Sequence, residues 1–222
     1  MNKDWSEKNK KMQSLIGKES TFREGIAELL ELRARLFGQI TSIVDTCPDE
    51  AFFQMPFAGA DGYHSKTLAY SMWHIFRIED IVAHTLIKQD SQVLFRDSWL
   101  DKTKSPIITT GNELKGAEIA EFSKQLDVKA VCGYCEAVMN ESNELLQSLG
   151  YKELKRRFTD KDKERLIDSR CVSTDESAFW LIDYWCGKDI RGLIKMPFSR
   201  HWIMHIEAMI RIKDKLSQKS SV

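Results

Sequence analysis

Two histidines stand four residues apart near the C-terminal end of the sequence, His201 and His205 in SRHWIMHIEAMIRIKDKL. Residues at positions i and i+4 lie on the same face of a helix, with Cβ atoms roughly 5–6 Å apart, so these two imidazoles can bind one metal ion. A third histidine on a facing helix would complete a tri-histidine site, and His74 in SMWHIFRIEDIVAHTLI is the candidate. Such a site leaves one coordination position open for water or substrate, which is typical of a catalytic metal.

A simpler interpretation of the same spacing is a polar stripe on an amphipathic helix. Apolar residues on both sides of the pair argue against a solvated stripe. They are Trp202, Ile203, Met204 and Ile206. Position 202 is Trp rather than the Glu of an HExxH motif, and the sequence has no ExxH pair to build a carboxylate-bridged di-iron centre. The spacing therefore favours a site made of histidines alone.

Other ionisable residues near His74 are predicted to point away from it. His64 and His84 each lie ten residues from His74. This separation places them about 80° around a helix that turns about 100° per residue, so we expect surface or packing residues. Glu79 follows His74 by five residues. It lies about 140° around the helix and is not expected to bind the metal directly.

The helix face of His74 is mixed in character rather than purely apolar. Its members are Thr67, Tyr70, Ser71, Ile78, Ile81 and Thr85. We expect such a face to line a pocket, with Tyr70 and Ser71, and Tyr134 from a later helix, as its hydrogen-bond donors. The sequence assigns no general acid or base.

Five cysteines are spread along the chain, and Cys132 and Cys135 form a CGYC motif. A CxxC pair can act in redox chemistry or supply half of a zinc site. This pair lies inside a helical pattern, VKAVCGYCEAVMNESNELLQSL, with no second CxxC in the sequence. We expect reduced, structural thiols.

Composition excludes some classes of function. The 222 residues include 33 Lys and Arg and 33 Asp and Glu, so the formal net charge is zero. Without a basic tract, nucleic acid is not an expected ligand, because phosphate binding needs clustered positive charge. The opening MNKDWSEKNKK has no apolar stretch of the kind found in signal peptides, and no apolar run is long enough to span a membrane. We expect a cytoplasmic protein.

Hydrophobic periodicity along the chain is almost entirely helical. Thr21 followed by Glu24, and Ser173 followed by Glu176, have the spacing of capping boxes. Asp127 is a suitable N-cap for a later helix, which Gly150 would end. The long helices are predicted at about 21–46, 65–88, 127–149 and 197–216.

These elements predict an all-α protein built as a four-helix bundle. A charged segment at about 151–195 reads as an insertion of short helices between the third and fourth long helices. Residues 1–18 are predicted to be loosely ordered, and residues 19–222 to form a single domain. Bundles of this kind hold metals with side chains that point inward from different helices.

The order of these features resembles the DinB family, also called the DinB/YfiT-like metalloenzymes. The resemblance spans about residues 21–216 and is carried by SMWHIFRIED, by the TGNELKGAEIAEFSKQLDVKAVCGYCEAV region and by the HxxxH of SRHWIMHIEAMI. It implies a four-helix bundle in which His74, His201 and His205 bind a divalent metal, zinc or nickel. The segment 151–195 is longer and more charged than in a minimal member, so the resemblance does not define the pocket.

Family members that act as thiol-dependent transferases or isomerases imply a metal-activated nucleophile. The expected function is a thiol-dependent transferase or a hydrolase, with a small-molecule substrate and a low-molecular-weight thiol as partners. One alternative is a non-catalytic metal-binding module of the stress response, and another is a structural bundle in which the histidines coincide by chance. A homodimer is compatible with the sequence, whereas nucleic acid and membrane partners are not expected.

Overall fold

All regular secondary structure in the described part of the chain is helical. The computed structural model describes residues 2–219, which contain no strand beyond one isolated bridge between Arg157 and Asp189. The α-helices are α1 (Lys3–Leu15), α2 (Phe22–Thr46), α3 (Leu68–Asp80), α4 (Trp99–Thr103), α5 (Ala117–Gln125), α6 (Val128–Ser148), α7 (Asp160–Asp168), α8 (Glu176–Cys186), α9 (Ile190–Ile194) and α10 (His201–Lys219). Short 3₁₀ segments are η1 (Glu19–Thr21), η2 (Asp49–Phe53), η3 (Gly62–His64), η5 (Val93–Phe95) and η6 (Tyr151–Lys155), and the π-helical segments are η4 (Ile81–Lys88) and η7 (Met196–Arg200). The prediction of an all-α protein is confirmed.

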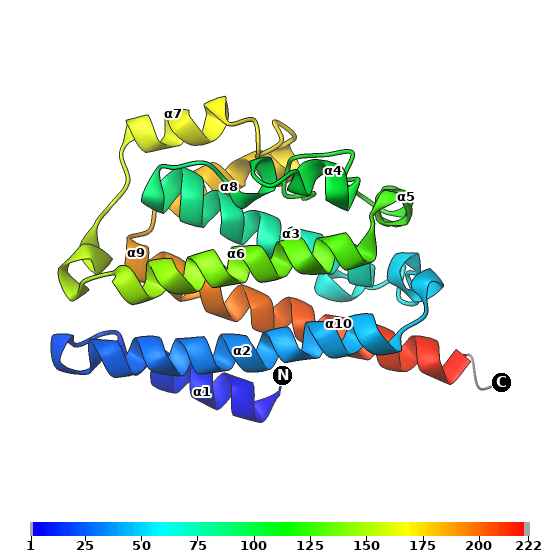
Figure 1. Cartoon of the computed structure of the whole chain (residues 1–222), viewed down its shortest axis with the longest axis horizontal. Coiled ribbons are helices and arrows are strands. Elements are labelled where there is room, and N and C mark those ends of the chain that lie inside the picture. Colours follow the sequence, from blue (N-terminus) through cyan, green and yellow to red (C-terminus); the bar gives the residue numbers. More distant parts are fainter. Residues whose placement is uncertain (1, 220–222) are drawn as a thin grey trace.

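The longest helices pack along one another (Figure 1). Helix α2 contacts α6 and α10, and α3 also contacts α6 and α10. Helices α2 and α6 bury residues at three- and four-residue intervals, as an amphipathic helix must when one face meets the core. In α2 these include Ile26, Leu29, Leu32, Leu36, Ile40 and Ile43.

The helix ends agree with the sequence at some positions and differ at others. Asp127 caps α6 as predicted, with its side chain accepting from the Ala130 backbone N–H at 3.1 Å. The capping box at Thr21 is wrong, because the Thr21 hydroxyl donates to the Leu15 carbonyl at 2.8 Å instead. At α8 the cap is Asp175 rather than Ser173, since Asp175 accepts from the Ser177 backbone N–H.

Helix α3 is buried around its whole circumference, so its charged residues need partners inside the protein. Glu79 accepts two hydrogen bonds from Arg33 of α2, at 2.6 and 2.9 Å, and both side chains are fully buried. Arg77 forms the second buried pair, 2.9 Å from Asp80. Buried pairs of this kind fix relative positions more than they add stability, and here the Arg33–Glu79 pair links α3 to α2.

The N-terminal segment differs from expectation. Residues 1–18 were expected to be loosely ordered, yet residues 3–15 form α1, which packs along α2 (Figure 1). Trp5, Met12 and Ile16 are buried there. They follow one face of a helix at spacings of seven and four residues, a sparse stripe within an otherwise polar segment. The single domain assigned to residues 19–222 stays a prediction.

The segment between α6 and α10 contains α7, α8 and α9, as predicted for the insertion at 151–195. Helix α7 packs on α8, and α9 leads directly into η7 and α10. Over residues 2–219, no helix is both long enough and apolar enough to cross a membrane.

Candidate metal centre

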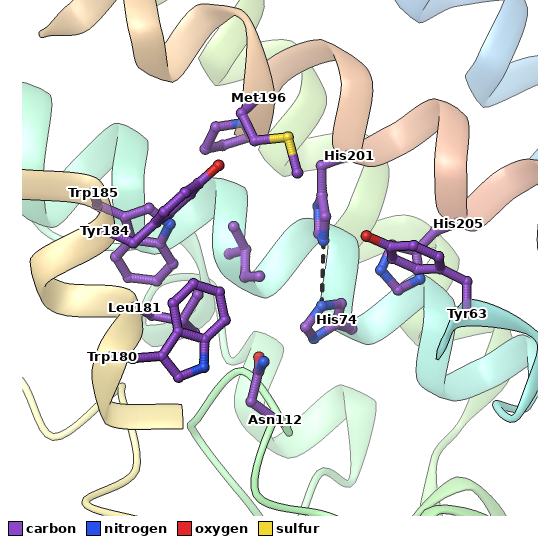
Figure 2. Close-up of a pocket in the computed structure, with 12 residues that line it drawn as sticks. Tyr63, His74, Asn112, Trp180, Leu181, Tyr184, Trp185, Met196, His201 and His205 are labelled. Carbon is purple, nitrogen blue, oxygen red and sulfur yellow. Dashed lines mark hydrogen bonds between the residues drawn. The ribbon is translucent and has the colours of Figure 1, made fainter. Parts of the chain in front are cut away.

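The three predicted histidines meet in the interior, between α3 and α10. One ring nitrogen from each of His74, His201 and His205 lies within 4.8 Å of the other two. The Nε2 atoms of His74 and His201 are 3.3 Å apart, and Figure 2 shows these rings pointing toward each other. Ring centroids are separated by 4.6–5.1 Å across the group. The predicted convergence is therefore present, and all three side chains are buried.

A backbone carbonyl fixes the orientation of His74. Its Nδ1 lies 2.8 Å from the Thr110 carbonyl oxygen. A carbonyl can only accept, so Nδ1 carries the proton and Nε2 of the neutral ring presents a lone pair toward His201. This is the arrangement that metal-binding histidines adopt, with one nitrogen for the ion and the other held by a hydrogen bond. Tyr70 stacks on the same ring, 5.4 Å away and nearly parallel at 11°.

His201 and His205 lack such support within the described chain. The Nδ1 atom of each is buried and has no hydrogen-bond partner among residues 2–219. A buried polar atom without a partner is unfavourable, and such orphaned nitrogens are rare in proteins. The Nε2–H of His201 can donate to the Nε2 lone pair of His74 in the neutral cluster. If the proton of His201 lies on Nδ1 instead, the Nε2 atoms of His74 and His201 both present lone pairs, and a cation can bind between them.

Electrostatics keep the three rings neutral at pH 7. Burial lowers the pKa of His74 to about 4, although its hydrogen bond to Thr110 opposes the shift. Burial also sets the pKa of His201 and His205 well below the usual value, and the neighbouring imidazoles add to the effect. Neutral imidazole is the form that binds metals. The donor set therefore fits a divalent transition ion without a proton having to leave at pH 7.

Irregular helix segments adjoin both helices that carry the cluster. A π-helical segment, η7, directly precedes His201, and another, η4, follows α3. In η7, the Ser199 hydroxyl donates to the Ile194 carbonyl at 2.8 Å. Pro197 lies in the same segment and has no backbone N–H to donate. Such π-helical turns concentrate at functional sites, where they change the register of one helix face.

A cavity of about 230 Å³ opens beside the histidines. Figure 2 shows its walls: the three rings and Tyr63 on one side, and residues of α8 on the other. The α8 residues are Trp180, Leu181, Tyr184 and Trp185. The described residues that line the cavity include no Lys, Arg, Asp or Glu. No fourth metal-binding side chain joins the three histidines within residues 2–219.

Tyr63 also lines the cavity, although the sequence does not predict it to be a site residue. It lies in η3, and its ring packs edge-on against His205 with a centroid separation of 4.6 Å. Its hydroxyl points into the cavity and makes no hydrogen bond with another described residue (Figure 2). Burial raises its pKa, so the phenol is protonated at neutral pH. The local sequence GYHS lies between helices and has no periodicity that would have assigned it a face.

The predicted pocket donors are wrong, because none of them lines the cavity. The Tyr70 hydroxyl donates to the Gly111 carbonyl, and Ser71 donates to the Thr67 carbonyl. Tyr134 donates to Asp80 at 2.8 Å. These hydroxyl groups bond to other parts of the protein. Tyr70 and Ser71 lie on α3, which is buried on every side, and Tyr134 is on the buried face of α6.

The residues predicted to lie outside the site do so. His84 is 2.6 Å from Asp90 through Nδ1, and His64 Nε2 is 3.1 Å from Arg211. Neither lines the cavity. Glu79 is occupied by Arg33 and by the indole N–H of Trp202, which donates at 2.8 Å.

The cysteines are free thiols rather than disulfides. Burial raises the pKa of Cys132 and holds that of Cys135 well above its usual value. A thiol that stays protonated is a poor nucleophile and a poor metal ligand. This agrees with the structural role predicted for the CGYC motif.

Comparison of the chain with models of known protein families and with curated proteins finds no match. The interpretation of the site therefore rests on its geometry and chemistry.

Proposed function

We propose that this chain is a metal-dependent enzyme of the DinB type, in which His74, His201 and His205 hold one divalent ion. In this proposal α2, α3, α6 and α10 are the four-helix bundle, which their side-by-side packing supports. The observation that carries the proposal is the convergence of three neutral, buried imidazoles beside a cavity. Imidazole ligands suit zinc and nickel, which are the metals we propose.

The reaction we propose is attack by a small activated nucleophile on an electrophilic substrate. Three neutral ligands leave the charge of a bound ion uncompensated, which lowers the pKa of a thiol or water at the open position. With a low-molecular-weight thiol the protein would be a transferase: the sulfur bonds to an electrophilic carbon and the leaving group departs with its electron pair. With water it would be a hydrolase.

Different residues have different roles in the proposed reaction. The Thr110 carbonyl keeps His74 in the tautomer that offers Nε2. The protonated Tyr63 hydroxyl faces the cavity and can donate a proton or a hydrogen bond to the departing group. The apolar walls limit water around the reacting atoms, which strengthens each electrostatic interaction there.

The cavity favours an enzyme over the non-catalytic metal-binding module. A storage or structural site is normally closed by four protein ligands, whereas a catalytic one keeps a position for substrate. Three ligand side chains and an adjoining cavity agree with the second description.

Cobalt substitution tests the proposal directly. We expect about one Co²⁺ per chain, with visible bands typical of low-symmetry coordination, and a new thiolate-to-cobalt charge-transfer band when 2-mercaptoethanol is added. His201→Ala should lose the ion, whereas His64→Ala should keep it. Absence of stoichiometric metal would refute the site. Metal that is held without any response to thiol, in a protein that unfolds on chelation, would instead indicate a structural ion.

A further inference from the structure

The wall that faces the histidines across the cavity comes from the inserted segment. Trp180, Leu181, Tyr184 and Trp185 all belong to α8, within the residues 151–195. Trp180 packs edge-on against Tyr184, with centroids 5.5 Å apart and an angle of 71°. The Trp180 indole N–H donates to the Ser177 carbonyl at 2.9 Å, which orients the ring. The insertion thus supplies a preformed aromatic wall (Figure 2).

Trp180 has the exposure of a residue at the mouth of a site. Its side chain is 50% exposed although it lines the cavity, whereas Trp185 behind it is 1% exposed. A large, half-exposed aromatic residue beside a cavity offers apolar area and a π-face to a ligand. Phe179, the next residue, is 41% exposed but does not line the cavity.

The cavity is unsuited to a charged group. The described residues that line it include no Lys, Arg, Asp or Glu. In the part of the cavity that α8 lines, on the side opposite the histidines, a carboxylate or ammonium would lose its hydration without meeting a counterion. The nearby Lys66 ammonium lies 5.0 Å above the Tyr70 ring and is not among the lining residues.

The cavity has room for an aromatic ring system. An apolar cavity of about 150 Å³ accommodates benzene. The volume here is about 230 Å³, enough for one ring with a short polar arm or for a fused bicycle. Trp180 and Tyr184, packed edge-on to one another at 71°, line this space with two aromatic rings against which a flat ring can pack.

We propose that this cavity binds the neutral, flat, aromatic part of a small-molecule substrate, with α8 as the wall that selects it. The inference rests on the proposed function, because the polar end of the substrate would meet the nucleophile at the histidine cluster. It goes beyond that function by assigning a substrate class, and by giving the inserted segment the role of determining specificity.

Three hydroxamates that share one metal-binding group test the preference on the zinc-loaded protein. They are acetohydroxamic acid, with no ring, benzohydroxamic acid, with a neutral ring, and 4-carboxybenzohydroxamic acid, with a charged ring. Calorimetry should show benzohydroxamic acid binding roughly tenfold to a hundredfold tighter than acetohydroxamic acid, from burial of the ring. The carboxylate should remove most of that gain.

Substitutions at the mouth separate the wall from the metal. Trp180→Ala should reduce the ring preference severalfold and leave the affinity for acetohydroxamic acid unchanged, while Phe179→Ala is the matched control and should leave both unchanged. Trp180→Arg should turn the preference toward 4-carboxybenzohydroxamic acid. Phe179 and Trp180 are both exposed, so we expect these variants to fold as the wild type does, and circular dichroism tests this.

The outcomes distinguish this inference from the proposed function. If zinc and acetohydroxamic acid bind but the ring brings no gain, or if Phe179→Ala and Trp180→Ala behave alike, the aromatic site is refuted and the metal site stands. If zinc does not bind, the proposed function fails. Indole, which has no metal-binding group, then tests the cavity alone by calorimetry, and Trp180→Ala should weaken its binding severalfold. A wild-type protein that does not respond to indole would overturn the inference in that case.

Discussion

Acidification of the metal-free protein should reveal the neutral state of the buried histidines. Burial lowers the pKa of His74 from the usual 6.5 to about 4. The unfolded chain therefore takes up a proton as pH falls through about 6.5, while the folded protein does not until about pH 4. The stability from this histidine is complete above pH 6.5 and is lost progressively between these two values.

The size of the effect follows from the shift. Each unit of pKa difference is worth about 1.4 kcal/mol, so the 6.5-to-4 shift of His74 corresponds to about 3 kcal/mol of unfolding free energy. His201 and His205 shift in the same direction and add to the loss. A typical domain has only about 5–15 kcal/mol of stability, so this is a substantial fraction.

Urea unfolding in the presence of a chelator, from pH 7 to pH 4, measures the effect. Carboxylates also titrate at the acid end of this range, so the informative quantity is the difference between the wild type and His74→Gln. That difference should change by about 3 kcal/mol across the range, in the direction that favours the variant at low pH. His64→Gln, outside the buried cluster, should follow the wild type. Parallel loss of stability in the wild type and His74→Gln would refute the assignment of His74 as a buried neutral base.

Further predictions concern the ligands, Tyr63 and the buried ion pair. Alanine at His74, His201 or His205 should each abolish stoichiometric zinc by elemental analysis, whereas His84→Ala should not; full occupancy in any of the three would remove that residue from the ligand set. Tyr63→Phe should keep the metal content and lower turnover about 10²-fold or more if the hydroxyl is the proton donor, as a kinetic assay with a substrate carrying a poor leaving group would show. Glu79→Ala should lower the unfolding free energy by about 3–5 kcal/mol by leaving Arg33 buried and unpaired, while the double variant Arg33→Met with Glu79→Leu should recover most of it in urea titrations. Lys11→Ala, at the surface ion pair with Glu28, should change little, and a similarly small effect of Glu79→Ala would contradict the role assigned to the buried pair.

The convergence of the histidines could be predicted from the spacing of two of them and from a family resemblance for the third. The four-residue spacing of His201 and His205 determines their shared helix face whatever the rest of the chain does. The third ligand is less determined by spacing: His74 lies in an apolar helical stretch, and the resemblance to the DinB family implies that it binds the metal with the other two. The four-helix bundle and the DinB resemblance stay predictions, because packing of long helices is compatible with more than one topology.

The hydrogen-bond donors of the cavity could not be predicted from the sequence. Periodicity shows which residues share a helix face, but it does not show which part of the chain packs on that face. Tyr70 and Ser71 are on the expected helix, but their hydroxyls meet the carbonyls of Gly111 and Thr67. The Gly111 carbonyl belongs to an irregular stretch between α4 and α5, whose path no spacing rule specifies. The same stretch supplies the Thr110 carbonyl that orients His74. Residues far apart in sequence thus decide which polar groups reach the cavity.

The inserted segment shows why a charged stretch can hide an apolar site. Residues 151–168 are dominated by charges, and the sequence predicts no more than an insertion of short helices at 151–195. Helix α8 begins only at Glu176, and within it Leu181 and Trp185 join the core while Trp180 lies at the cavity mouth. The charged α7 packs on α8, so the insertion combines a charged helix with an aromatic wall of the cavity. A segment of this construction can change the substrate of a metal site without altering the helices that carry its ligands, because α8 contributes to the cavity and none of the three histidines.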